Sequence, residues 1–558
     1  MSNEDCVNHV KMLGDNLFSK RMSLLSLWQE LAENFYPARA DFTRTLSLGT
    51  DRNGSLMTSA PVIARRNLAN AFSTMLRPTA KPWFNIRSRR PDQEDTEAKQ
   101  YLEKLTRLQK DAMYDSRSGF VRATKTADND FATFGQAVLQ CELYRPGDGS
   151  QPHLLHRCWH LRDCAWMEND VGIIDTMYRQ WTPTATTLST LFRDKVHSET
   201  TKLLEKTPYA EVKCWHVVMP AKMYATFPGA KKFMQPFVSM IIDVDNVHMI
   251  ECVGQWSFGY VVPRWEVVSG SQYANSPATD AAVADARLLQ QITHVILEAG
   301  EKAVNPPMVA VQDAIRGDVP IYAGGITWVD ADYDERTGEA LRPMASDHKG
   351  LTFGHEMIAD LRMQIGEGFF LNKLNLPPQG GPDMTAYEVG QRVQEYIRNA
   401  LPLFEPVEME YNSKVCEEDL GLMMRADPVI AQDAPPSMRG QTVEFQFESP
   451  LREAIDKMKV GQMLEASQVL TQAMQLDPSV AMLVDMTKGT RDVLTAVIPA
   501  AWMRTESEVD ILKKKAAQQA AQQQMMQGLE QAAGVAKTAS EAAGNTADMM
   551  GLTPQAGA

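Results

Sequence analysis

Six histidines and cysteines in the middle of the chain are of the types that bind zinc. They are His156, Cys158, His160, Cys164, Cys214 and His216. Imidazole and thiolate are the usual ligands of structural zinc, but this spacing does not match a zinc ribbon. Alternate residues of a strand share a face, so His156, Cys158 and His160 would lie too close together for a tetrahedral site. We therefore favour a half-buried strand and expect neither a metal nor a cofactor.

Other catalytic patterns are missing from the sequence. It contains no G-x-x-x-x-G-K-[ST] phosphate loop, no G-x-S-x-G nucleophile turn and no H-E-x-x-H helix. The tripeptide Gly354-His355-Glu356 is only a fragment of the last motif. We expect that the chain is not an enzyme and that any ATP-hydrolysing motor is a partner. A metal-dependent nuclease stays as a minor hypothesis, which requires bound metal.

The charge balance argues against a broad DNA-gripping face. The formal net charge is -14 and the pI is about 5.3, whereas proteins that hold nucleic acid along a wide surface are usually basic. Arg87, Arg89 and Arg90 form a local basic cluster, but three acidic residues follow within five positions. This pattern indicates a charge-balanced surface rather than a DNA-binding patch.

Length and composition indicate a folded chain with more than one packed region. It has 558 residues, of which 44% are hydrophobic and 23% charged. The start, MSNEDCVNHVKML, lacks the features of a secretory signal, and no apolar stretch is long enough to span a membrane. Seven scattered cysteines without a C-x-x-C pair indicate reduced thiols.

The first half of the chain predicts helices and then strands. Apolar residues at helical spacing over 7–37 predict one long helix that ends before Pro37. Further helical patterns follow, and the pattern from Ser118 leads through Gly135 into a strand-like run, AVLQCEL. Residues 153–265 carry β-branched and aromatic runs separated by Gly, Pro and Asp, which predicts a β-rich region.

Two long helices flanking a turn-rich excursion are expected next. The first, between Pro277 and Asn305, would be about 40 Å long. Residues 306–350 are punctuated by Pro and Gly, and the second helix runs from about Thr352 to Leu374. A loop over 374–384 then precedes a third helix, whose start is marked by a capping box at Thr385 and Glu388. Helices are expected from Ser449 onward, ending in a low-complexity tract.

Several strings, in this order, resemble the portal, or head-to-tail connector, family of short-tailed bacteriophages. They are ANAFSTMLRPTAKPWFNI (69–86), FATFGQAVL (131–139), PRWEVVSGSQYANSPATDAAVADARLLQQITHVILEAGEKAVNPP (263–307), MTAYEV (384–389), FESPLREA (447–454) and VIPAAWMRTESEVDILKKK (497–515). Tyr273, Ser276, Pro277, Pro306 and Pro307 match the family pattern in place. Ala274 and Asn275 depart from it, because Gly and Arg are commoner there.

The resemblance implies an α+β, mainly α, subunit that assembles into a ring, usually of twelve copies. Its parts would be a wing (1–276), a first stem helix (277–305), a clip (306–350), a second stem helix (351–373), a channel loop (374–384), a wing helix and return (385–448), a crown (449–508) and a C-terminal barrel or low-complexity tail (509–558). The implied function is a channel at one capsid vertex for DNA packaging and ejection, assembled in the host cytoplasm and carried in the virion.

The implied partners are double-stranded DNA, the terminase, tail adaptor and nozzle proteins, and the major capsid and scaffolding proteins, with no membrane.

A DNA channel should not hold phosphates, because each neutralised phosphate adds affinity and hinders sliding. An acidic chain meets that requirement, with basic groups at a few positions only. Candidate channel residues are Asn372, Lys373, Asn375 and Gln379, and candidate clip contacts are Arg316, Asp318, Arg342 and Lys349. The alternative is a tail or scaffold protein that does not conduct DNA.

Overall fold

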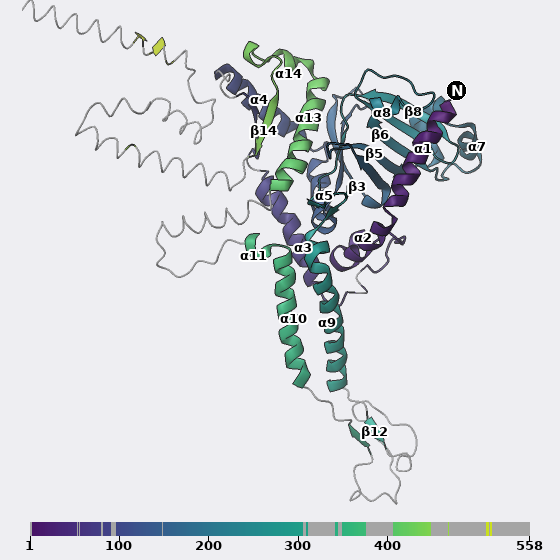
Figure 1. The fold of residues 1–558 in the computed structure, drawn as a ribbon, viewed down its shortest axis with the longest axis vertical. Coiled ribbons are helices and arrows are strands. Elements are labelled where there is room, and N and C mark those ends of the chain that lie inside the picture. Colours follow the sequence, from purple (N-terminus) through teal and green to yellow (C-terminus); the bar gives the residue numbers. More distant parts are fainter. Residues whose placement is uncertain are drawn as a thin grey trace, which may run out of the picture. The chain divides into compact units, whose positions relative to one another are not determined.

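A computed structural model describes residues 3–447 apart from 53, 55, 80–81, 91–95, 148, 305–307, 311–340, 344–348 and 375–404, together with residues 467, 509, 511, 512, 514 and 515. The chain, whose helices and strands Figure 1 shows, divides into two units. Unit 1 comprises Met1–Asn85, Leu105–Gln432 and Phe445–Ala454; unit 2 comprises Ile86–Lys104, Asp433–Glu444 and Ile455–Ala558.

Two N-terminal helices replace the single helix expected over 7–37. α1 covers Asn3–Lys20 and α2 covers Met22–Phe35, so the prediction is wrong at Arg21. The Arg21 side chain is buried, and its guanidinium donates hydrogen bonds to the main-chain carbonyls of Leu161 and Arg162. The break lets α1 pack on a sheet while α2 packs on other helices.

Three α-helices and several short elements lead from α2 to strand β2. They are η1 (Pro37–Arg39), α3 (Ala60–Ala71), the π-helical turn η2 (Phe72–Leu76), β1 (Phe84–Ser88), α4 (Thr96–Met113) and α5 (Phe120–Phe134). α5 ends at Gly135, whose φ of 72° lies in the left-handed region. β2 (Val138–Tyr144) follows, which confirms the helix, glycine and strand order expected from the sequence.

The β-rich region expected over 153–265 is present, and its strands form two antiparallel sheets, one of which includes β2. The first has the order β3-β2-β9, with β3 at His153–Trp159 and β9 at Tyr260–Val261. The second has the order β4-β5-β6-β7-β8, and its strands are β4 (Cys164–Glu168), β5 (Ile174–Trp181), β6 (Cys214–Pro220), β7 (Phe237–Asp243) and β8 (His248–Gln255). The sequence pattern missed the inserted elements η4 (Leu161–Asp163), α6 (Ala185–Phe192), η5 (Arg193–Lys195), α7 (Ser198–Lys206) and α8 (Ala221–Tyr224).

Strand β6 is buried on both faces, from Cys214 to Met219. On one face the Trp215 ring lies 5.3 Å from the Phe18 ring of α1. On the other face His216 meets Tyr260 of β9. The five-stranded sheet is thus covered by α1 on one side and by the smaller sheet on the other, which accounts for the continuous burial of β6.

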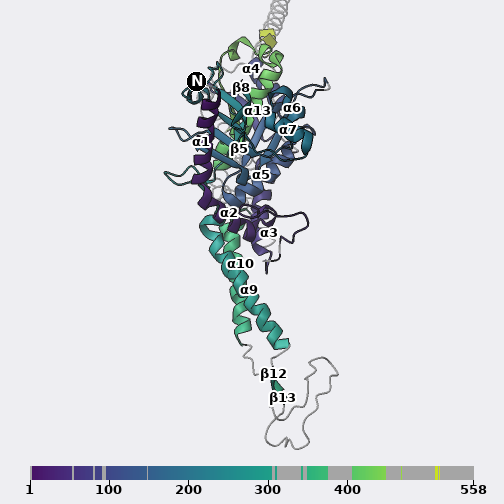
Figure 2. The same ribbon diagram turned by 90° about the vertical axis from the view of Figure 1, so that its right-hand side faces the viewer.

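Two long helices run side by side after these sheets (Figures 1 and 2). β10 (Glu266–Val267), β11 (Ala274–Asn275) and the π-helical turn η6 (Ala278–Ala282) lead into α9 (Val283–Val304). β12 (Met308–Ala310) pairs with β13 (Leu341–Pro343), and α10 (Lys349–Gly368) returns alongside α9. The pair projects from unit 1 on the side away from the two sheets.

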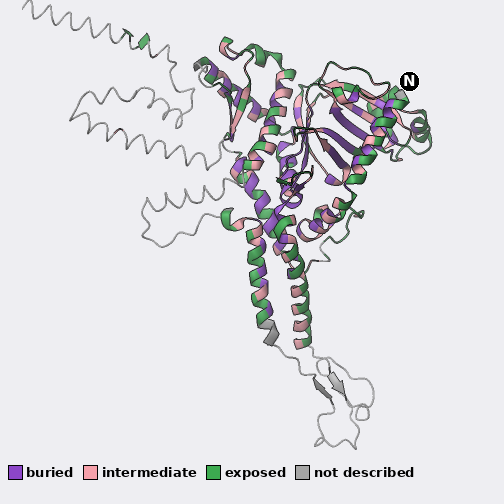
Figure 3. Ribbon diagram, viewed as in Figure 1, coloured by how far each residue is buried: buried purple, intermediate pink, exposed green. Residues whose placement is uncertain are grey.

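The contact between α9 and α10 uses one narrow stripe of each helix. On α10 the buried stripe consists of Gly354, Ile358, Leu361 and Ile365, at helical spacing. A Cβ atom at Gly354 would lie 2.6 Å from Cδ1 of Ile296, so the glycine permits the close approach of the helices. Their outer faces are exposed (Figure 3), including the large apolar residues Leu288, Val295, Leu297, Phe353 and Met363.

The second expected long helix is interrupted near its end. α10 ends at Gly368, and the chain turns at Phe370 before the short helix α11 (Leu371–Leu374). Phe370 has a φ of 58°, a conformation that bulky residues rarely adopt. Its ring stacks on Trp265 with 6.1 Å between centroids, and the Phe369 ring lies 5.3 Å from Phe35. These aromatic contacts fix the base of the helix pair to the rest of unit 1.

The last described elements are η8 (Val407–Asn412), α13 (Ser413–Ala426), α14 (Pro428–Gln432), η9 (Pro436–Met438) and β14 (Val443–Phe447), which pairs with β1. The expected capping box at Thr385 and Glu388 lies outside the described residues, as do the helices expected from 449, isolated positions excepted. Among the helices that are described, none has the length and hydrophobicity of a membrane span.

Candidate functional site

Two of the four candidate channel residues lie on α11. Asn372 and Lys373 are both exposed there. The Lys373 ammonium lies 5.4 Å from the centre of the Phe370 ring, and the Lys373 main-chain N–H donates to the Phe370 carbonyl over 2.9 Å. These contacts hold the cation beside the turn that ends α10. Asn375 and Gln379 lie outside the described residues, so their proximity to Lys373 stays a prediction.

The candidate clip residues are described only through their backbone, or not at all. Arg342 lies on β13 opposite Val309 of β12, and Lys349 is the first residue of α10. The side chains of both, and the whole of Arg316 and Asp318, lie outside the described residues. Their role in binding a partner stays a prediction.

The six histidines and cysteines considered for zinc do not form one cluster in the described part of the chain. Nε2 of His160 bonds to Asp41 over 2.6 Å, and the Cys158 thiol lies 3.7 Å from the Asp130 carboxylate. Strand β3 alternates as expected, with His156 buried and Arg157 exposed. The expectation of a half-buried strand is therefore confirmed.

His216 is enclosed by hydrogen-bond partners that favour its neutral form. Nδ1 lies 2.6 Å from the Tyr260 hydroxyl and Nε2 lies 2.9 Å from the Ser239 hydroxyl. Nε of Arg179 donates to the same Tyr260 oxygen over 3.1 Å. Burial, together with the nearby Arg179 charge, lowers the pKa of His216 to about 3. The imidazole thus stays uncharged inside the fold under mildly acidic conditions.

This network predicts an acid-sensitive step in stability. Between pH 6.5 and pH 3 the unfolded chain binds a proton at His216 that the folded chain does not, so stability should fall as the pH falls, by up to about 1.4 kcal/mol per pH unit. His216→Gln should flatten the pH dependence of the urea midpoint in this window. His9→Gln, at an exposed position, controls for the loss of an imidazole. Equal slopes for His216→Gln and the unmodified chain would contradict the assignment.

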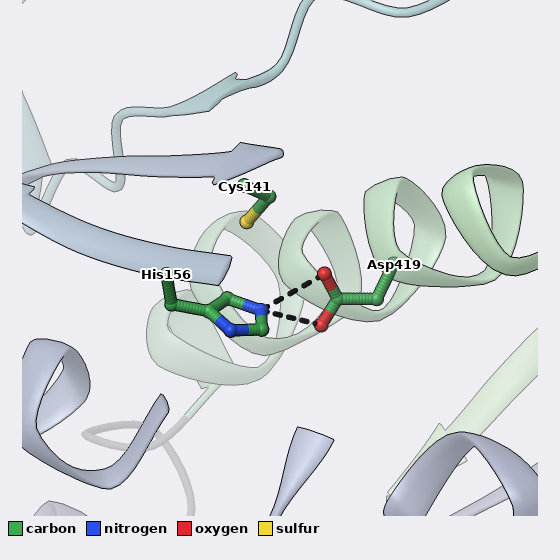
Figure 4. A group of neighbouring side chains, drawn as sticks. All are labelled: Cys141, His156 and Asp419. Atoms are coloured by element: carbon green, nitrogen blue, oxygen red, sulfur yellow. Dashed lines mark hydrogen bonds and ion pairs between the residues drawn. The ribbon is translucent and has the colours of Figure 1, made fainter. Parts of the chain in front are cut away.

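A cluster that the sequence did not predict joins strands β2 and β3 of the small sheet to α13. Cys141 on β2 and His156 on β3 face each other in register, and Asp419 comes from α13 (Figure 4). Both Asp419 carboxylate oxygens lie 2.9 Å from Nε2 of His156, while Nδ1 lies 3.3 Å from the Ser118 carbonyl oxygen. The His156 and Asp419 side chains are fully buried.

Electrostatics hold this cluster together. Burial alone would lower the pKa of His156, but the Asp419 carboxylate more than offsets this and raises it above the usual value. Burial raises the pKa of the Cys141 thiol well above its usual value, and nearby carboxylates add to the effect. Two neighbouring strands could have been paired from the sequence, but Asp419 is 263 residues from His156 and carries no local signal.

The described residues form an α+β protein, in which a helix pair with exposed apolar faces projects from a well-packed body. Exposed apolar helix faces are typical of subunits that are completed by assembly. The chain belongs to the family described as bacteriophage head to tail connecting protein, whose model matches residues 7–500. The expectation from the sequence is thereby confirmed.

Two curated relatives are similar over most of their length. The chain is 25% identical to a probable portal protein of Bordetella phage BPP-1 over 444 residues, which cover 78% of each chain. It is 22% identical to the portal protein of Salmonella phage epsilon15 over 551 residues, which cover 97% of this chain and 96% of the relative. A solved chain from the virion of a native gene transfer agent particle matches 80% of this chain at 10% identity and a TM-score of 0.29, too low to support a conclusion.

Proposed function

We propose that this chain is the subunit of a phage portal, a ring of twelve copies at one capsid vertex through which DNA is packaged and ejected. Family membership and the names of both relatives support this function over a tail or scaffold protein that does not conduct DNA. The role is structural, and the virion is its location. Assembly of the ring takes place in the host cytoplasm.

The observation that carries the proposal is the outer surface of the helix pair, where large apolar side chains are exposed. Leu288 and Val295 lie seven residues apart on one face of α9, and Val295 is 60% exposed. Phe353 and Met363 of α10 are 64% and 59% exposed. In a ring, the helix pairs of neighbouring copies cover these side chains and remove them from water. The pair is then the stem, formed from residues 277–305 and 351–373.

Charge pairing on α9 is consistent with DNA that slides. Its two basic residues are Arg287 and Lys302, and each has an acidic partner. Nη2 of Arg287 lies 2.7 Å from Glu30, and Nζ of Lys302 lies 2.7 Å from Glu298. A cation paired with a carboxylate attracts a passing phosphate less than a free one does. The residues that contact the passing DNA are instead Lys373 and Asn372, together with Asn375 and Gln379 of the proposed channel loop.

The remaining regions take the roles implied by the family. Residues 306–350 form the clip, which binds the terminase during packaging and tail adaptor and nozzle proteins afterwards, with Arg316, Asp318, Arg342 and Lys349 as contact candidates. Residues 1–276 and 385–448 form the wing, which meets the capsid and scaffolding proteins. Residues 374–384 form the channel loop, 449–508 the crown and 509–558 a barrel extension.

Ring formation should depend on the exposed face of α9. Electron microscopy of the purified chain is expected to show rings with a central hole. Val295→Lys should shift the population toward monomers, because it places an ammonium where the neighbouring stem must pack. Circular dichroism should stay unchanged, since the side chain is exposed in the single chain.

Val171→Lys is the matched control, because Val171 is 75% exposed on a turn between β4 and β5, far from α9 in the sequence. It should assemble as the unmodified chain does. Monomers or dimers for the unmodified chain at several salt concentrations would contradict the proposed ring. If Val295→Lys forms rings as the unmodified chain does, then α9 does not lie in the interface between neighbouring subunits.

A further inference from the structure

We propose that Cys141, His156 and Asp419 form a buried binding site for a divalent transition metal of the zinc type, which joins α13 to strands β2 and β3. The ligand atoms of the three residues all lie within 4.8 Å of one another. The site is separate from the channel and clip candidates and does not depend on the proposed portal function. The metal would have a structural role in unit 1, where it would stabilise the packing of α13 on these strands.

The three donor atoms are of the kinds that bind zinc. Cys141 offers its sulfur, His156 offers Nε2 and Asp419 offers a carboxylate oxygen, and both Asp419 oxygens lie 2.9 Å from Nε2 (Figure 4). A thiolate, an imidazole and a carboxylate together suit zinc rather than calcium or magnesium, which prefer oxygen ligands alone. Ligand atoms in a tetrahedral zinc site lie about 3.3–3.7 Å apart, so small side-chain movements suffice.

The second nitrogen of His156 is already oriented as in metal sites. Nδ1 faces the Ser118 carbonyl oxygen at 3.3 Å, and the same oxygen accepts the His156 main-chain N–H over 2.7 Å. Metal-bound histidines usually donate their other N–H to such an oxygen, which fixes the tautomer and leaves Nε2 for the metal. The Phe120 ring packs edge-on against the imidazole with 5.1 Å between centroids, which excludes water from this side.

Binding of a divalent cation would leave the net charge of the buried cluster unchanged. A protonated His156 beside the Asp419 carboxylate, with Cys141 as a thiol, carries no net charge. Binding of one divalent cation releases one proton from Nε2 of His156 and one from the Cys141 sulfur. The product contains the cation, a thiolate, a neutral imidazole and a carboxylate, so the net charge of the site is zero before and after.

The test measures metal directly in the unmodified chain. Protein produced in zinc-supplemented medium should carry one zinc per chain by mass spectrometry of the metal. Protein produced with cobalt should show visible absorption bands of tetrahedral cobalt and a near-ultraviolet thiolate-to-cobalt band. This second measurement requires no variant, so it stays valid where a substitution prevents folding. If the protein contains no zinc and shows no cobalt bands, the proposed metal site is wrong, and His156 and Asp419 form an ion pair only.

Two variants locate the metal. Cys141→Ser and Asp419→Asn should each lose the bound zinc, and the thiolate-to-cobalt band should vanish in Cys141→Ser. Cys252→Ser is the matched control, because Cys252 is a half-buried thiol of β8 that bonds to Tyr224 and lies outside the cluster. It should keep one zinc per chain. Equal zinc in Cys141→Ser and in the unmodified chain would overturn the assignment.

Discussion

Replacement of Arg77 by methionine is expected to destabilise unit 1 by about 3–5 kcal/mol, because it leaves a carboxylate without its partner in the interior. The Arg77 guanidinium forms an ion pair with Asp128, and both side chains are nearly inaccessible, at 3% and 2% exposure. It also donates to the Asn412 side chain over 2.9 Å and lies 4.7 Å from the centre of the Tyr411 ring. One side chain therefore ties η8 to α5.

The charge state of this pair supports the expected size of the effect. Burial acts to lower the pKa of Arg77, but the Asp128 carboxylate outweighs it, so the pKa lies above its usual value and the guanidinium stays charged. Without that cation, Asp128 and Asn412 would each be buried with an unmet bonding group. Urea denaturation followed by tryptophan fluorescence measures the loss.

Two further variants separate a missing partner from general damage. Arg77→Met combined with Asp128→Leu should recover most of the stability, because apolar residues of similar size often replace a buried pair without loss. Arg117→Met removes an arginine from an ion pair with Asp115 that is exposed, and it should change the midpoint little. If Arg77→Met lowers the free energy of unfolding no more than Arg117→Met does, the role assigned to Arg77 is contradicted.

Gly135→Ala is expected to have an effect of similar size, above about 3 kcal/mol, because a backbone clash adds to conformational strain. Gly135 has a φ of 72°, and a Cβ atom there would lie 2.2 Å from the Asn275 oxygen and 2.9 Å from the Ser276 nitrogen. Main-chain atoms cannot rotate away as a side chain can. Asn275 and Ser276 lead directly into η6 and α9, so their displacement should also disturb the stem and prevent ring assembly.

Comparison with Gly149→Ala separates the cost of the left-handed backbone conformation from the cost of the steric clash. Gly149 also has a positive φ, of 81°, but beyond its two chain neighbours no atom of the described residues lies within 4 Å of the position that a Cβ would take. The strain of a left-handed alanine is about 1–2 kcal/mol, so Gly149→Ala should be mild and leave rings intact. Thermal unfolding and electron microscopy of both variants make the comparison. Equal effects would show that the contact between Gly135 and Asn275 is unimportant.

Local patterns predicted much of the described secondary structure. The helix, Gly135 and strand order, the β-rich region after residue 153 and the long helix after Pro277 are all present. These features depend on hydrophobic periodicity and on glycine and proline, which act on near neighbours. The helices α6 and α7 were not predicted, because they are short insertions between strands.

The candidate site was predicted less completely. Lys373 and Asn372 were expected to lie at the end of the second long helix, but that helix ends at Gly368 and both residues lie on the short helix α11. His156 was considered for zinc with neighbours in the sequence, whereas its nearest polar partners are Asp419 and Ser118. Register between two strands decides that Cys141 faces His156, and helix packing decides that Asp419 closes the group.

The sequence by itself determined most of the long elements, the acidic balance and the family, because these depend on local spacing, on composition or on ordered strings. Only the tertiary structure decided the break at Arg21, the turn at Phe370 and the buried partners of Arg77 and His156. Arg21 bonds to carbonyls 140 and 141 residues away, and Arg77 bonds to Asn412 across 335 residues. Such contacts are set by how the elements pack, and no local pattern encodes a partner at that separation.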